Sequence, residues 1–238
     1  MPDLSIPLPD AATEIDRRRI PGWYGKLPGI GDFATRRLPP GFVLPWDQWL
    51  QRALAASQAE LGDAWLDTYL SSPIWRFALS AGVCGPDAWC GILVPSVDRV
   101  GRYFPLTIAV AVDPLTPFDF LVAQADWFDA VEQVALDCLR VTVRPDDVES
   151  GLEGQPLPAG AVSRARLDAT QIAALARADG DLLDLSPQSD LGAMVAAATQ
   201  MALAQDLSPR TLWWTTAGGA APITVVGARG LPESARFA

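Results

Sequence analysis

Two apolar runs joined by a short polar connection constrain the fold of this chain most strongly. Residues 89–94 and 103–112 are almost continuously apolar, a pattern typical of strands that are covered on both faces. Only residues 95–102 separate the two runs, whereas parallel neighbours need a crossover of roughly a dozen residues or more. The sequence therefore predicts an antiparallel pair at the centre of a sheet, with helices flanking both faces.

Further helices and strands are predicted on either side of this pair. Apolar residues recur at three- and four-residue spacing after Phe42, which predicts a helix with Pro45 in its first turn and Gly62 at its end. Similar patterns favour helices at 65–70, 117–140, 168–176 and 191–204. Apolar stretches rich in aromatic and β-branched residues favour strands at 23–24, 74–79, 211–215 and 223–226.

These elements predict one α/β (α+β) domain with a central, largely antiparallel or mixed β-sheet. Strands are expected near both ends of residues 21–238, so this range is interpreted as a single sandwich-like domain. Residues 1–20 hold three Pro and no useful period, and they are predicted to be a flexible tail. Residues 144–163 are rich in Pro, Gly and acid, which predicts a long loop.

The composition argues against several classes of function. The formal net charge is −10, and binding to nucleic acid or to an anionic membrane requires a basic face. The chain has no His and only one Lys. The usual general base and the commonest metal ligand are therefore missing, and we expect no enzyme activity, metal or cofactor.

The same composition indicates a cytoplasmic location. Three Cys without a C-x-x-C spacing suggest thiols kept reduced. The first residues lack the charged and apolar regions of a signal peptide. No run reaches the roughly 18 apolar residues that a membrane span needs, so we expect no insertion into a membrane.

Two polar loops hold the candidate functional residues. Asp32 and Asp98 are candidates for a pair of carboxylates in acid–base hydrolysis, and Arg99 and Arg102 for the grip on a phosphate. Basic residues lie near each Asp, however, and a paired carboxylate stays ionised and cannot act as a general acid. The residues alone favour ion pairs that fix the loops; a phosphate- or phosphopeptide-binding sensor or hydrolase is the alternative.

The motifs in these loops resemble one known family. They read W-Y-G-K-L-P-G-I-G-D-F at 23–33 and P-S-V-D-R-V-G-R at 95–102, with W-D-Q-W-L at 46–50 and P-I-W-R-F-A-L at 73–79. This combination resembles the TagF/ImpM family, whose members are associated with bacterial type VI secretion systems. The resemblance is strongest over residues 22–112 and weaker at the C-terminal strands.

The resemblance implies a non-enzymatic, cytoplasmic accessory protein. Such proteins act after translation as negative regulators, or repressors, of the secretion machine by binding a forkhead-associated scaffold protein. The family has no established catalytic residues, so none is assigned, and no oligomeric state follows. The positions that match the family signature are expected to organise the loops or to contact the partner: Lys26, Gly31, Asp32, Ser96, Asp98, Arg99, Gly101 and Arg102.

Overall fold

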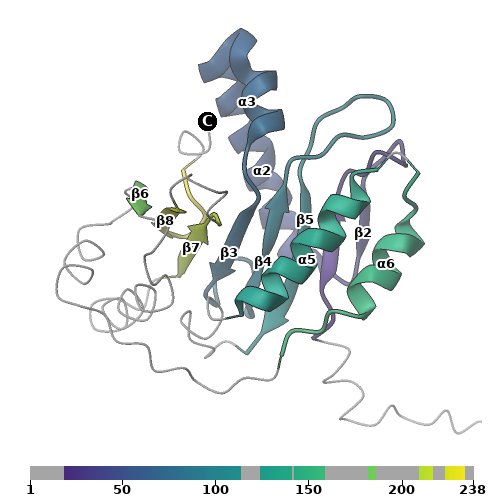
Figure 1. Cartoon of the computed structure of the whole chain (residues 1–238). Helices are drawn as coiled ribbons and strands as arrows, with labels where there is room; N and C mark the ends of the chain where they lie inside the picture. The colour runs from purple at the N-terminus through teal and green to yellow at the C-terminus, as the bar shows by residue number, and fades with distance from the viewer. Residues whose placement is uncertain are drawn as a thin grey trace, which may run out of the picture.

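The computed structural model describes residues 19–113, 124–140, 142–158, 182–185, 209–216 and 223–233. Within these residues the chain forms one sheet of eight strands in the order β2-β1-β5-β4-β3-β7-β8-β6 (Figure 1). All neighbouring pairs are antiparallel. The strands are β1 Gly22–Gly25, β2 Ala34–Arg36, β3 Trp75–Leu79, β4 Ala88–Val94, β5 Leu106–Val112, β6 Leu182–Leu185, β7 Arg210–Trp214 and β8 Ile223–Arg229.

The predicted central hairpin is present. β4 and β5 pair antiparallel, with Ile92 opposite Ile108, and the sequence-based prediction of an α/β chain with a largely antiparallel sheet is confirmed. β4 is buried along its whole length and β5 from Leu106 to Val110, in agreement with their continuous apolar character. β1 then pairs with the outer side of β5, which brings the chain after β1 next to the β4–β5 connection.

The described helices are α2 Pro40–Leu61, α3 Trp65–Ser71, α5 Ala125–Cys138 and α6 Pro145–Glu153, with a 3₁₀ turn at Gly62–Ala64. Residues of β4 alternate between two apolar clusters. Cys90 and Ile92 belong to a cluster that includes Phe128 of α5 and Val148 of α6. Trp89 and Leu93 belong to another that includes Phe42, Trp46 and Trp49 of α2. Figure 1 shows α5 and α6 in front of the strands.

The start of α2 differs from the prediction. The helix begins at Pro40, so Pro45 lies inside it rather than in its first turn. Pro40 occupies the first turn, where the missing N–H has no helical partner to lose. The Pro39 carbonyl oxygen accepts hydrogen bonds from the backbone N–H groups of Phe42 and Val43, both at 3.0 Å. The predicted end at Gly62 is confirmed, since Gly62 is the C-cap with φ 52°.

Part of the predicted loop at 144–163 is helical. Pro145 starts α6, and the Asp147 carboxylate accepts a hydrogen bond from the Arg144 backbone N–H at 2.8 Å. Val148 and Leu152, four residues apart, are both buried in the cluster with α5. This pairing outweighs the Pro- and Gly-rich composition of the segment, so the prediction of a continuous loop was wrong for 145–153.

The end of the predicted tail also makes specific contacts. Arg19 Nε donates to the Leu157 carbonyl oxygen at 2.7 Å, and the Leu157 N–H donates to the Arg19 carbonyl at 2.8 Å. Residues 1–18 lie outside the described residues, as do the helices predicted at 168–176 and 191–204. Within the predicted helix at 117–140, the described part is α5.

Candidate functional site

Two connections meet at one end of the sheet, and together we call them the signature loops. They are residues 26–33, between β1 and β2, and residues 95–105, between β4 and β5. The pairing of Tyr24 in β1 with Thr107 in β5 places the start of the first loop beside the end of the second. Farther out, the Arg99 backbone N–H donates to the Ile30 carbonyl oxygen at 2.9 Å. The family motifs at 23–33 and 95–102 therefore form one structural unit.

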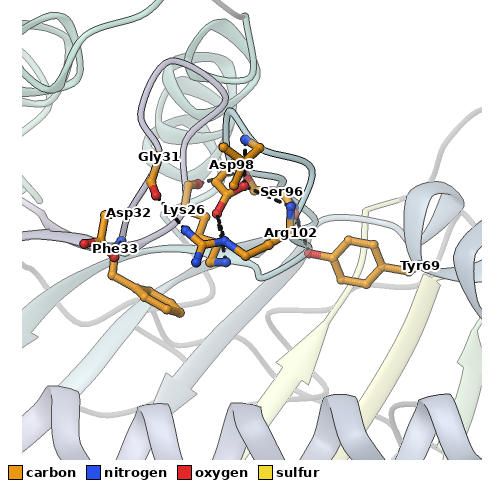
Figure 2. A network of polar contacts seen from close by, with 9 residues as sticks. Lys26, Gly31, Asp32, Phe33, Tyr69, Ser96, Asp98 and Arg102 are labelled. Atoms are coloured by element: carbon orange, nitrogen blue, oxygen red, sulfur yellow. Dashed lines mark hydrogen bonds and ion pairs between the residues drawn. The ribbon is translucent and has the colours of Figure 1, made fainter.

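The Asp98 carboxylate is the centre of this unit (Figure 2). Its Oδ2 accepts hydrogen bonds from Lys26 Nζ at 3.0 Å and from Arg102 Nε at 2.7 Å. Its Oδ1 accepts the backbone N–H groups of Val100 at 3.0 Å and Arg102 at 2.9 Å. The carboxylate thus joins one loop to the other and also closes the turn of its own loop.

Asp98 is ionised although it is buried. Burial by itself raises the pKa of this carboxyl group, but the hydrogen bonds from Arg102, Lys26 and Val100 outweigh that effect and hold the pKa well below its usual range. The side chain of Asp98 is fully covered and that of Lys26 is 6% exposed. The only Lys of the chain is therefore committed to a buried ion pair with Asp98.

Ser96 connects the loops at a second point and links them to α3. Its hydroxyl group donates to the Lys26 carbonyl oxygen at 2.7 Å. The Tyr69 hydroxyl group of α3 accepts from the Ser96 backbone N–H at 2.9 Å and donates to the Ser96 carbonyl oxygen at 2.8 Å. Tyr69 also lines a cavity of about 440 Å³ between α2, α3 and the strand ends. Sequence reasoning placed Tyr69 on a helix but had no signal for this contact.

The glycines of the motifs fit the backbone of the loops. Gly101 has φ +84°, a region that favours Gly, and its N–H donates to the Asp98 carbonyl oxygen at 3.0 Å. The carbonyl oxygen of Gly31 accepts a hydrogen bond from Arg102 Nη2 at 2.6 Å. Both predicted glycines therefore take part in the contact between the two loops.

Asp32 and the Arg99 side chain lie outside this hydrogen-bonded centre. The Asp32 carboxylate is exposed and accepts the Phe33 backbone N–H at 2.8 Å. The Arg99 guanidinium is also exposed, and its Nη2 would be 3.4 Å from a Cβ added to Gly31. Hydrogen bonds around Asp98 and Lys26 thus join six of the eight predicted residues, namely Lys26, Gly31, Ser96, Asp98, Gly101 and Arg102. The side chains of Asp32 and Arg99 take no part in these bonds.

Phe33 is a residue of this site that sequence reasoning did not single out by itself. Its ring stacks on Tyr24 at 5.8 Å between centroids and meets Phe104 edge-on at 4.8 Å. Lys26 Nζ lies 4.9 Å from the centre of the same ring. Three contacts hold the ring, although 44% of the residue is exposed.

Residues 22–154 match the model of a family described as the TagF N-terminal domain, type VI secretion system-associated. The match covers more than half of the chain. The chain belongs to the TagF family. This confirms the family that the motifs indicated, and the match extends beyond those motifs through α5 and α6. No curated protein matches this TagF-family chain significantly.

A solved structure supports the same relationship. The chain is similar to PA0076 from Pseudomonas aeruginosa PAO1, with 35% sequence identity and a TM-score of 0.67. The alignment covers 91% of this chain and 91% of that chain. The two proteins thus correspond over nearly their whole length.

No helix in the described segments has the length and apolar character needed to cross a bilayer. Likewise, in the part of the chain that the structure describes, no three Cys, Asp or Glu side chains are grouped so that they could hold a metal ion.

Proposed function

We propose that this TagF-family chain is a non-enzymatic, cytoplasmic negative regulator of a bacterial type VI secretion system. It acts after translation by binding a forkhead-associated scaffold protein and so withholding that protein from the secretion machine. The observation that carries this proposal is the family match over residues 22–154. The construction of the signature loops supports a binding role, because their polar groups form a fixed scaffold beneath exposed side chains.

The same geometry gives little support to the alternative of a hydrolase or phosphate sensor. A carboxylate whose pKa is held low has no proton to donate near neutral pH, and Asp98 is of this kind. Both of its oxygens already accept two hydrogen bonds each. We propose that Lys26, Ser96 and Asp98 organise the loops and that the partner contacts side chains above them.

We propose that helices cover both faces of the sheet and that the partner docks elsewhere. The two apolar clusters support it, because α5 and α6 contribute to one and α2 to the other. With the faces covered, the loops at the end of the sheet are the regions left for a partner.

Two measurements test the proposed function. Excess protein in the native bacterium is expected to suppress secretion, and the purified protein is expected to co-purify with the scaffold protein. Asp98→Ala and Arg102→Ala are expected to weaken both effects, whereas Arg52→Ala, at an exposed position of α2, serves as the matched control. Unchanged secretion together with absence of co-purification would contradict the proposal.

A screen of ligands addresses the alternative directly. Saturable binding of a phosphate ester or nucleotide by the full chain, detected as a rise in unfolding temperature, would favour the phosphate-handling function. We expect no such rise.

A further inference from the structure

The outer surface of the signature loops combines exposed apolar and cationic side chains. Phe33 is 44% exposed and Val100 is 65% exposed, the largest value among the exposed large apolar residues described. The two cationic residues of this turn, Arg99 and Arg102, are also exposed. We call Phe33, Arg99, Val100 and Arg102 the loop patch.

We propose that the loop patch docks an acidic segment of a partner protein, with carboxylates against the two guanidinium groups and an apolar side chain against Phe33 and Val100. For the identity of the partner, this inference rests on the proposed function. It adds the surface and the chemistry of the segment that the surface recognises.

The contacts within the loops place these four side chains in one small area. Arg102 Nη2 donates to the Gly31 carbonyl at 2.6 Å, and Arg99 Nη2 lies beside the Cα of the same glycine. Lys26 Nζ joins Asp98 at 3.0 Å and lies 4.9 Å from the Phe33 ring centre. Arg102 Nε bonds to the same Asp98 oxygen at 2.7 Å, so Phe33 and Arg102 both lie next to the buried Lys26–Asp98 pair.

Charge favours an acidic occupant. The signature loops hold Lys26, Arg99 and Arg102 against Asp32 and Asp98, whereas the whole chain has a net charge of −10. Lys26 and Asp98 neutralise each other in the buried centre. Among the residues that the structure describes, the Arg99 guanidinium has no carboxylate within salt-bridge distance. Guanidinium groups form charge-assisted hydrogen bonds to carboxylates, so an acidic segment fits this surface.

The loop patch is also ordered before a partner arrives. Asp98 and the Gly31 carbonyl hold Nε and Nη2 of Arg102, yet its side chain is 56% exposed. Tyr24 and Phe104 hold the Phe33 ring from two directions. Fixed aromatic and Arg side chains are common at the energetic centres of interfaces, because little conformational entropy remains to be lost on binding.

The first test measures the affinity of the full-length protein for the purified scaffold protein. Arg99→Glu and Val100→Glu are expected to weaken binding about tenfold or more, whereas the control Arg52→Glu makes the same charge change as Arg99→Glu on α2 and is expected to have little effect. Higher salt is expected to weaken wild-type binding. If the scaffold binds wild type and all three variants equally, the loop patch is not the docking surface, although the proposed function survives.

The second test does not depend on the scaffold protein. The ¹⁵N-labelled full chain is titrated with a synthetic peptide of glutamates around one leucine, and with its lysine counterpart. Only the glutamate peptide is expected to shift the amide signals of Gly31, Val100 and Gly101. Equal shifts with both peptides, or shifts confined to other regions, would overturn the inference even if the scaffold fails to bind.

A second copy of this chain is the competing occupant. Sedimentation of wild type and Arg99→Glu separates the two cases. We expect both to sediment alike, and a concentration-dependent dimer that Arg99→Glu abolishes would assign the loop patch to self-association and overturn its assignment to an acidic partner.

Discussion

Asp98 is buried, and yet its pKa is held low. The four donors that surround it make this arrangement stable, and each of them belongs to a signature motif or to the turn itself. Removal of one member of a buried ion pair costs about 3–5 kcal/mol, because the remaining charge is left without compensation. The contribution of Asp98 can therefore be measured as a change in the free energy of unfolding.

Asp98→Asn is expected to lower the free energy of unfolding by about 3 kcal/mol. The amide keeps an oxygen for the backbone N–H groups of Val100 and Arg102 but places a neutral group against Lys26 Nζ. Urea unfolding followed by Trp fluorescence measures the effect. Asp32→Asn is the matched control, because Asp32 is exposed and accepts a hydrogen bond from the Phe33 N–H, and it is expected to change stability by less than about 1 kcal/mol.

The pH dependence of the destabilisation by Asp98→Asn tests whether the charge of Asp98 is its cause. The pKa of Asp98 is lower in the folded chain than its ordinary value of 3.8, so the unfolded chain takes up the proton more readily. The stabilisation is therefore complete above that value and is lost as the pH falls below it towards the folded pKa. The difference in free energy of unfolding between wild type and Asp98→Asn should narrow below about pH 4. A difference that is constant between pH 7 and pH 3 would show that the charge is not its origin.

At the scale of elements, one phenol group joins α3 to the signature loops. Burial raises the pKa of Tyr69, so its hydroxyl group stays protonated and can donate to the Ser96 carbonyl oxygen. The Tyr69 hydroxyl oxygen in turn accepts a hydrogen bond from the Ser96 backbone N–H. In Tyr69→Phe that N–H loses its partner inside the protein, which is expected to cost about 1–3 kcal/mol.

Hydrogen exchange distinguishes a local effect of Tyr69→Phe from a general one. The Ser96 amide is expected to exchange faster in the variant, whereas the Ile92 amide in the middle of β4 should change only as much as global stability does. Thr68→Ala is the control on the same helix, because the exposed Thr68 hydroxyl donates only to the Ala64 carbonyl oxygen of its own helical turn. If Ser96 exchange is equal in wild type and Tyr69→Phe, then Tyr69 does not hold the loop.

At the scale of the whole molecule, the two apolar clusters meet across the β4–β5 pair. Gly91 lies at the middle of this pair, opposite Ala109. A Cβ at Gly91 would come within 2.1 Å of the Ile108 carbonyl oxygen and 2.9 Å of the Phe77 ring. The absence of a side chain at Gly91 therefore lets the central strands and Phe77 approach closely.

Gly91→Ala is expected to destabilise the fold by about 2 kcal/mol or more, since the backbone of β5 would have to move. Thermal unfolding and the soluble yield report the effect. Gly41→Ala is the control, because nothing lies within 4 Å of a Cβ at that helical position, and it is expected to unfold at the same temperature as wild type or slightly higher. Equal stability of the two variants would contradict the close packing at Gly91.

The sequence by itself determined the centre of the sheet, the family and the residues of the signature loops. Strand pairing at 89–94 and 103–112 followed from a connection too short for a crossover, which is a local constraint. The composition and the apolar pattern of residues 144–163 did not reveal α6, because the stability of this helix comes from Val148 and Leu152 packing against α5. Likewise, β2 and β6 are short edge strands with little pattern of their own.

Only the tertiary structure decided which charges of the signature loops are buried and which are exposed. Lys26 and Asp98 are 72 positions apart in the chain, and their pairing depends on β1 lying beside β5. The same pairing leaves Arg99 and Val100 at the surface. Spacing along a chain predicts helices and strands well because both have fixed periods. It does not predict which distant residues come into contact when strands pair.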